Sequence, residues 1–208
     1  ILDAIVHLKG TDGTTAEVKT DSKGEFKFAE KGTARYIVEH TSYEITVSAP
    51  EYLNAKGNET TVGEEESKVF YHQYQLQPVD KPIKLPEVLF DLAKWDLLPQ
   101  SKDSLNFLYD ILIDNPTITI ELSAHTDSRD SDKKNQVLSQ KRAQSCVNYM
   151  IEKGIDAGRM NAKGYGESKP KITDAQIAKM NSKVEKEDAH QKNRRVEFGV
   201  LSDDYVPK

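Results

Sequence analysis

Two short runs of the chain combine an acid and an arginine in a way that suits binding of a small zwitterion. Ala124-His125-Thr126-Asp127 ends an alternating apolar pattern, and Leu138-Ser139-Gln140-Lys141-Arg142-Ala143 follows within a helical pattern. An ionised Asp accepts hydrogen bonds from an ammonium, and the planar Arg guanidinium matches a carboxylate in two parallel hydrogen bonds. One α-amino acid terminus carries both groups, so Asp127 and Arg142 together predict a zwitterion site.

The elements around these runs are expected to bring both side chains to one corner. Apolar and polar residues alternate over 118–124, which predicts a strand with one buried face. Asp127 then follows the carboxyl end of that strand, a usual place for ligands in α/β folds. A helix expected over 135–153 puts Asn135 and Arg142 on one side, because 3.6 residues complete a turn. From spacing alone, an Asp127–Arg142 salt bridge that pins the loop is as consistent as a ligand site.

The C-terminal part of the chain predicts an α/β sandwich of the order β-α-β-α-β with a further strand. This order places the helices on one face of the sheet. A short helix is expected near 175–180, and the charged run Lys183–Asp188 is expected to be a solvated loop rather than a partner site. The expected strands cover residues 88–90, 118–124, 159–164 and 195–200, and the expected helices run from Pro99 to Asn115-Pro116 and over 135–153.

Residues 1–77 predict a small β-sandwich, because short alternating segments recur between turn residues. Their order resembles the carboxypeptidase regulatory-like domain, which implies a transthyretin-like sandwich without catalytic residues of its own. Residues 78–86 contain three prolines and are expected to form an extended linker. The expected strands cover residues 4–8, 16–20, 25–28, 35–38, 43–47 and 69–76.

Composition and charge exclude several classes of function. The 208 residues carry a formal net charge of −5, so nucleic acid phosphates would meet no basic field. No apolar run reaches the length of a transmembrane segment. The chain begins at Ile1 without a signal-like segment and is interpreted as a fragment of a longer protein. Cys146 is the only cysteine and is expected to be a small buried apolar residue.

Other candidates for chemistry are weaker. The five histidines show no metal-ligand spacing, and Asp12 and Asp21 fit turns better than a Ca²⁺ site, so no metal or cofactor is expected. His125 lacks a nucleophile or a third partner for catalysis. Gly164-Tyr165-Gly166 is too short for a nucleotide loop. Trp95 is expected to pack the loop before the first helix, with a sugar-stacking surface as the alternative.

Several short runs between residues 86 and 201 together form a recognisable pattern. They are His125-Thr126-Asp127, Asn135, Leu138-Ser139, Arg142-Ala143, Gly164-Tyr165-Gly166-Glu167 and Asn193-Arg194-Arg195-Val196. With these runs, residues 86–201 resemble the OmpA-like peptidoglycan-binding domain. Ala124 and Asp130 depart from the resemblance, since Gly is usual at both positions; Asp tolerates the left-handed conformation better than most residues.

This resemblance implies a non-catalytic domain that binds the meso-diaminopimelate of peptidoglycan stem peptides. It implies that Asp127 holds the amino group and Arg142 the carboxylate of that residue. Thr126 can add hydroxyl or backbone hydrogen bonds that fix the orientation of the ligand. The supporting residues that the resemblance implies are Asn135 and Arg194, for the peptide or the loop, and the backbone of Leu92 and Ala93, for the rim.

The resemblance also implies a place in the cell. A regulatory-like domain before an OmpA-like domain is similar to the C-terminal part of the peptidoglycan-binding outer-membrane lipoproteins of type IX secretion systems. It implies a periplasmic, outer-membrane-associated role in a Gram-negative bacterium, with peptidoglycan and secretion-system envelope proteins as partners. The alternatives are a peptidoglycan-processing hydrolase, which needs a nucleophile–base pair or a metal set, and a structural interaction domain with a vestigial pocket.

Overall fold

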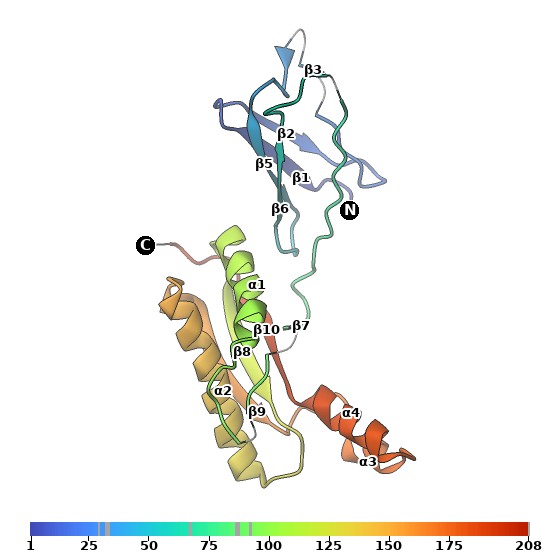
Figure 1. Cartoon of the computed structure of the whole chain (residues 1–208), viewed down its shortest axis with the longest axis vertical. Helices are drawn as coiled ribbons and strands as arrows, with labels where there is room; N and C mark the ends of the chain where they lie inside the picture. Colours follow the sequence, from blue (N-terminus) through green and yellow to red (C-terminus); the bar gives the residue numbers. More distant parts are fainter. Residues whose placement is uncertain (29, 32–33, 67, 86–87, 92, 208) are drawn as a thin grey trace. The chain divides into compact units, whose positions relative to one another are not determined.

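The computed structural model describes residues 1–28, 30–31, 34–66, 68–85, 88–91 and 93–207 (Figure 1). The chain forms two compact units, residues 1–79 and 80–208. The boundary falls within the proline-containing segment 78–86 expected as a linker. Part of that segment is a strand of the second unit, and its last residue, Pro86, lies outside the described residues. Over the described part of the chain, no helix is long and apolar enough to cross a membrane.

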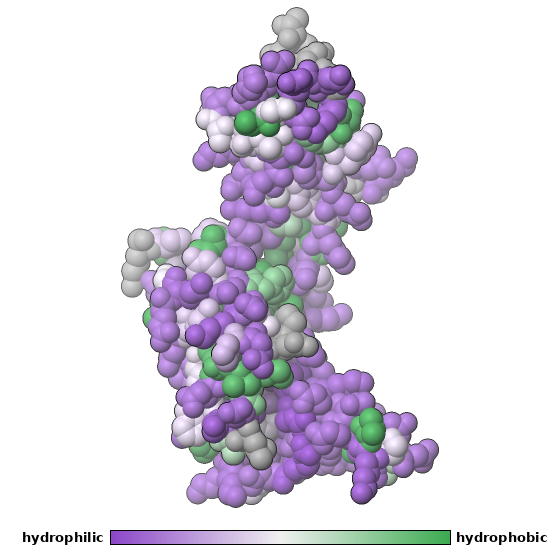
Figure 2. Space-filling view, in the orientation of Figure 1, coloured by the Kyte–Doolittle hydropathy of each residue, from purple (hydrophilic) through white to green (hydrophobic). Residues whose placement is uncertain are grey.

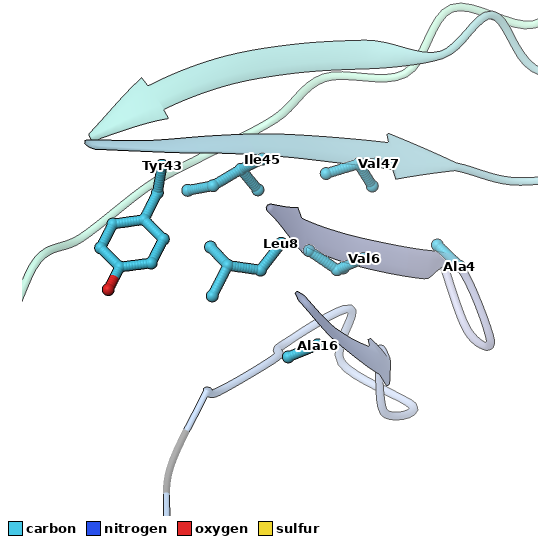
Figure 3. Close-up of a cluster of buried hydrophobic side chains, with 7 residues drawn as sticks. All are labelled: Ala4, Val6, Leu8, Ala16, Tyr43, Ile45 and Val47. Carbon is cyan, nitrogen blue, oxygen red and sulfur yellow. The ribbon is translucent and has the colours of Figure 1, made fainter. Parts of the chain in front are cut away.

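The first unit is built on a four-stranded antiparallel sheet in the order β2-β1-β5-β6. One face of the sheet is apolar because side chains alternate along each strand; Val6 of β1 faces Val47 of β5, and Leu8 faces Ile45 (Figure 3). All four of these side chains are buried. The strands are β1 (Ile5–Gly10), β2 (Thr15–Lys19), β5 (Ser42–Ser48) and β6 (Ala55–Thr60), and a separate ribbon pairs β3 (Glu30–Lys31) with β4 (Ala34–Arg35).

The expected strands 25–28 and 69–76 are wrong, and β6 was missed. The first two segments have no regular structure, although Phe26, Phe28 and Tyr74 pack against the core cluster as a strand face would. The alternating aromatic side chains there cover the sheet, but the backbone of these segments forms no strand of it. The β6 segment Ala55–Thr60 carries polar residues, so its alternation gave no apolar signal. A transthyretin-like sandwich is therefore not confirmed by the described strands.

The second unit has a four-stranded mixed sheet in the order β7-β10-β8-β9, in which β8 and β9 run parallel and the other neighbours are antiparallel. Figure 1 shows α1 and α2 on one face of this sheet, as the sequence predicts. The elements are β7 (Ile83–Lys84), α1 (Ser101–Asp114), β8 (Thr119–His125), α2 (Asp132–Glu152), a 3-10 turn (Ala157–Arg159), β9 (Met160–Gly166), α3 (Asp174–Ala178), α4 (Lys183–Asn193) and β10 (Arg195–Ser202).

The core of the second unit lies between this sheet and the two long helices. Fully buried leucines at positions 105, 108 and 112 form the inner stripe of α1, as their spacing predicts. Each such side chain contributes about 1.5–3 kcal/mol when it leaves water. Cys146 of α2 is also buried, and burial raises the pKa of its thiol to about 12, so it packs as an apolar residue.

Two local predictions in this unit were wrong. Residues 88–90 do not form a named strand; only Phe90 makes an isolated bridge, with Leu97. The charged run from Lys183 begins α4 instead of a loop, because Ser182 and Glu185 form a capping box that satisfies the first free N–H groups. In Figure 2 the surface over α3 and α4 is mostly hydrophilic, in keeping with this composition.

Gly164 lets β9 approach α2 closely. A Cβ atom at Gly164 would lie 2.2 Å from the backbone nitrogen of Gln140, so no other residue fits without a shift of the helix. Next to it, Gly166 adopts a φ of +52° and its N–H donates to the Ser139 hydroxyl at 2.8 Å. The Gly164-Tyr165-Gly166 run is therefore a packing motif between a strand and a helix.

Gly164→Ala should destabilise the second unit by roughly 1–3 kcal/mol, because the new methyl group overpacks against backbone. Gly199→Ala on β10 is the matched control: its new Cβ would meet no atom nearer than Pro82 at 4.0 Å, so we expect a change within about 0.5 kcal/mol. Denaturant unfolding followed by fluorescence of Trp95, the single tryptophan, reports on this unit. Equal stability of the two variants would contradict the close approach.

Candidate functional site

The candidate site lies where β8 ends and the chain turns toward α2. The N–H of Thr126 donates to the Gly166 carbonyl at 2.9 Å, which carries the β8–β9 pairing one residue beyond the strand. The side chains of Thr126 and Asp127 are both buried there. Among the described atoms, the Thr126 hydroxyl has no hydrogen-bond partner, and it lines a small polar hollow of about 50 Å³. The Thr126 hydroxyl is therefore a polar group without a described partner, in a hollow that neither Asp127 nor Arg142 lines.

Asn135, in the first turn of α2, fixes the loop that follows the strand. Its buried side-chain amide donates to the carbonyls of Asp127 at 3.0 Å and Asp130 at 3.2 Å, and to the Glu167 carboxylate at 2.5 Å. Of the two roles implied for Asn135, these contacts match support of the loop. Asp130 does not adopt a positive φ, so a glycine is not required at this position.

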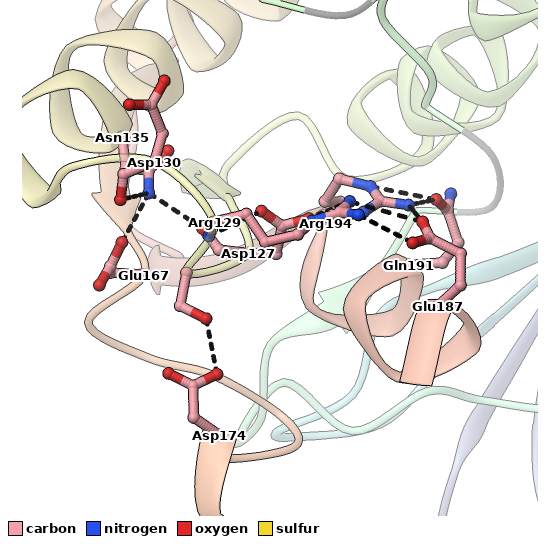
Figure 4. Close-up of polar contacts among 10 residues, drawn as sticks. Asp127, Arg129, Asp130, Asn135, Glu167, Asp174, Glu187, Gln191 and Arg194 are labelled. Atoms are coloured by element: carbon pink, nitrogen blue, oxygen red, sulfur yellow. Dashed lines mark hydrogen bonds and ion pairs between the residues drawn. The ribbon is translucent and has the colours of Figure 1, made fainter. Parts of the chain in front are cut away.

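Asp127 lies in a closed ring of four charged side chains (Figure 4). Its Oδ2 atom accepts from Arg129 Nε at 3.0 Å and Nη2 at 2.7 Å, and from Arg194 Nη1 at 2.5 Å. Glu187 of α4 closes the ring, since it accepts from Arg129 Nη1 at 2.8 Å and from Arg194 Nη2 at 2.7 Å. Two carboxylates and two guanidinium groups leave the ring with no net charge.

The ring keeps Asp127 ionised. Burial alone favours the neutral acid, but the hydrogen bonds from Arg129 and Arg194 outweigh it and hold the pKa of Asp127 below its usual value. Arg194 therefore supports Asp127 directly, from the point where α4 ends. The strand terminus thus carries an anion that is already paired with two guanidinium groups.

Arg142 lies close enough to Asp127 for the charge of that acid to act on its pKa, but Arg142 pairs with no acid among the described residues. Its Nε donates to the Lys94 carbonyl at 2.9 Å and its Nη2 to the Asp91 carbonyl at 3.2 Å, and the guanidinium lies 4.8 Å from the centre of the Phe90 ring. Among the described residues no carboxylate forms an ion pair with Arg142, Asp127 included. The alternative of an Asp127–Arg142 salt bridge is therefore wrong.

The environment of Arg142 makes it a receptor for an anion. Only 9% of the residue is exposed, and burial lowers the pKa of its guanidinium, with the charge of Arg194 acting in the same direction. A buried charge without a partner costs several kcal/mol, and a guanidinium offers five N–H donors, of which the described residues use two. A carboxylate that reached this fork would relieve the imbalance and gain two parallel hydrogen bonds.

The loop before α1 borders Arg142. Ala93 adopts a left-handed φ of +55°, and it sits between the residues whose carbonyls Arg142 binds. Leu92, the other residue expected at the rim, lies outside the described residues. Trp95 is 41% exposed, and the Lys141 ammonium lies 3.8 Å from its ring centre. Trp95 thus joins the loop to α2 through a cation–π contact and keeps part of its ring at the surface.

Arg129 and Glu187 were missed by sequence reasoning. Glu187 lies in the run expected to be a solvated loop, Arg129 lies in the polar loop after β8, and 58 residues separate them along the chain. The one local signal was the position of Arg129, two residues after Asp127 in a short loop, where its side chain reaches back to that carboxylate.

His125 belongs to a different, structural cluster. Its ring stacks on Tyr165 with centroids 5.3 Å apart, and its Nε2 lies 3.3 Å from a Glu197 oxygen. Burial lowers the pKa of His125, whereas the pKa of Glu197 is lowered because the neighbouring His125 ring and the hydrogen bonds that Glu197 accepts from Arg195 outweigh its burial. Within the part of the chain that the structure describes, no group of three or more His, Cys, Asp or Glu residues is placed to hold a metal ion.

Comparison with known proteins finds similarity to one family. Residues 89–183 match the model of the OmpA family. The second unit, with the α/β fold and mixed sheet described above, is therefore OmpA-like over those residues. The chain is 38% identical over 116 residues to Outer membrane protein A of Shimwellia blattae, a match that covers 55% of this chain and 48% of that protein.

Two further similarities cover other shares of the chain. It is 31% identical over 179 residues to the photosystem I P700 chlorophyll a apoprotein A2 of Gloeobacter violaceus, which is 84% of this chain and 20% of that protein. Among solved structures, the cell wall anchor of the T6SS from Pseudomonas aeruginosa is 27% identical with a TM-score of 0.44, over 55% of this chain and 75% of that one. The chain thus spans about half or less of the two curated relatives.

Proposed function

We propose that the OmpA-like domain binds peptidoglycan without catalysis and anchors an outer-membrane or periplasmic complex to the cell wall. The observation that carries the proposal is the buried Arg142 fork, which has no acidic partner among the described residues and lies at the same strand end as Asp127. The match of residues 89–183 to the OmpA family supports it further.

The ligand that fits both groups is the side-chain end of meso-diaminopimelate in the stem peptide. Its carboxylate pairs with the free N–H groups of Arg142, and its ammonium pairs with Asp127. Thr126 adds a hydroxyl that has no partner among the described atoms, and Asn135 holds the loop in place. A lysine in the same peptide position brings the ammonium but no carboxylate, so it leaves Arg142 unpaired.

The place of work that we propose is the periplasm of a Gram-negative bacterium, in association with the outer membrane. Similarity to proteins named Outer membrane protein A supports an envelope location. We further propose that the partners include envelope proteins of a type IX secretion system, with the first unit as the regulatory-like domain that meets them. What supports this finer proposal is the order of the two units along the chain.

The full chain should sediment with purified sacculi that contain meso-diaminopimelate and remain in solution with sacculi that contain lysine in its place. The reason is that only the first cell wall presents a carboxylate to Arg142. Comparing the pelleted fraction for the two sacculi measures this. Equal sedimentation with both would contradict recognition of the zwitterion, and absence from both pellets would contradict cell-wall binding.

A mass measurement on soluble stem peptide separates binding from hydrolysis. Stem peptide incubated with the chain should keep its mass, since the proposed site holds the ligand and supplies no nucleophile. Any cleavage product that depends on Asp127 or Arg142 would favour the hydrolase alternative.

A further inference from the structure

The cation position on Asp127 is already occupied by a side chain of the same protein. Oδ2 of Asp127 accepts three N–H groups, two of them from Arg129. A carboxylate offers about four acceptor positions over its two oxygens, so three donors saturate Oδ2, whereas Oδ1 accepts the backbone N–H of Arg129 at 3.3 Å. A ligand ammonium must therefore either take the place of a guanidinium on Oδ2 or bind Oδ1 beside the Arg129 guanidinium, and the positive charge of Arg129 opposes it in both positions.

Of the two arginines, Arg129 is the one placed to leave. Its side chain is 51% exposed, whereas that of Arg194 is 26% exposed and belongs to the end of α4. Arg129 sits on the polar loop after β8, and its other anchor is Glu187, which is 53% exposed. The Arg129–Glu187 pair joins two half-exposed side chains and contributes little, because water competes for both partners, whereas the Arg129–Asp127 pair joins an exposed arginine to a buried acid and is the contact that a ligand replaces. Arg129 can thus turn into solvent while Arg194 remains on Asp127.

We infer that Arg129 is an internal competitor of the ligand for Asp127 and that it sets the affinity threshold of the site. The inference rests on the proposed function. A ligand with an ammonium alone must displace Arg129 and gains only one ion pair in exchange. A ligand that also brings a carboxylate gains the Arg142 fork, which lies outside the ring and has no acidic partner among the described residues. Displacement of Arg129 lowers the affinity for both ligands. Only the ligand with both an ammonium and a carboxylate gains enough from Arg142 to bind tightly.

The test is Arg129→Gln in the full chain, titrated with a stem peptide that contains meso-diaminopimelate and with the matching lysine peptide. Both peptides should bind about two- to fivefold more tightly than to the unsubstituted chain, a factor typical of one exposed ion pair. Lys134→Gln is the matched control: it removes the same charge from an exposed position that pairs with Asp130, and it should leave both affinities unchanged.

The outcomes separate the inference from the proposed function. If the unsubstituted chain binds the diaminopimelate peptide and Arg129→Gln binds equally or more weakly, the competitor role is overturned and the function stands. If Lys134→Gln tightens binding as much as Arg129→Gln, net charge explains the effect and the inference is overturned. If neither the chain nor Arg129→Gln binds either peptide, the proposed function and the inference fall together. Thermal unfolding of each variant shows that the domain is intact.

Discussion

Replacing Arg142 by lysine should remove most of the affinity for the diaminopimelate stem peptide. Lysine keeps the positive charge but presents a single ammonium, so it loses the planar fork that matches a carboxylate. Loss of a hydrogen-bonded partner from a buried charge pair costs about 2–4 kcal/mol, which raises the dissociation constant roughly thirty- to thousandfold. Calorimetric titration of both proteins with the peptide measures this. The affinity for the lysine peptide, which lacks the carboxylate, should fall far less.

Arg159 provides the matched control for this substitution. It is another buried arginine of the second unit, and it also donates to backbone carbonyls, those of Ile118 at 3.0 Å and Asn115 at 2.6 Å. These acceptors precede β8, whereas Arg142 lies where β8 ends. Arg159→Lys should therefore lower stability to a similar degree and leave peptide binding intact. Equal losses of affinity in the two variants would mean that Arg142 acts only through the fold.

Asp127→Asn should weaken binding by about a hundredfold, because the ligand ammonium then loses its ionised partner. The substitution also leaves Arg129 and Arg194 with Glu187 as their shared acid, so a second measurement of stability belongs with it. Titration with the same peptide measures the loss. Binding that stays within a factor of two of the original would contradict a role for the Asp127 charge.

The pH dependence of binding follows from the same carboxylate. Since the pKa of Asp127 is lowered from its ordinary value of 3.8, the group stays ionised at and somewhat below that pH. A lowered folded-state pKa contributes stability above the ordinary value, and that contribution is lost as the pH falls through the folded-state value. Binding that depends on Asp127 should be level from neutral pH to about pH 4 and fall below it, whereas Asp127→Asn should lack this fall. A midpoint at pH 5–6 would point to another group.

Sequence patterns predicted the second unit well where burial sets a period. The alternation over 118–124 predicts β8, and the leucine spacing predicts α1, because each buried face repeats at the period of its element. The same patterns failed for β6 and α4. Both are polar segments, so they show no apolar period. Pairing with β5 holds β6 in place, and a capping box starts α4.

At the site, the sequence predicts that Asp127 and Arg142 share one corner but not how each side chain is paired. The charge of Asp127 acts on the pKa of Arg142, yet no hydrogen bond or ion pair joins these two described residues. Their actual partners lie far away in the chain: Arg194 is 67 residues from Asp127, and the Asp91 carbonyl is 51 residues from Arg142. Such long-range pairs depend on tertiary packing, which local spacing does not encode. Glu187 could not be predicted for the same reason, whereas Arg129 lies two residues from Asp127 and had that local signal.

In the proposed site, Arg142 binds a carboxylate of the ligand while Asp127 binds its ammonium. The most direct measurement is a calorimetric titration of the full chain with two stem peptides that differ only in meso-diaminopimelate or lysine. We expect saturable one-to-one binding of the meso-diaminopimelate peptide. The affinity for the lysine peptide should be at least thirtyfold weaker, a difference of about 2 kcal/mol. Equal affinities for the two peptides would contradict it.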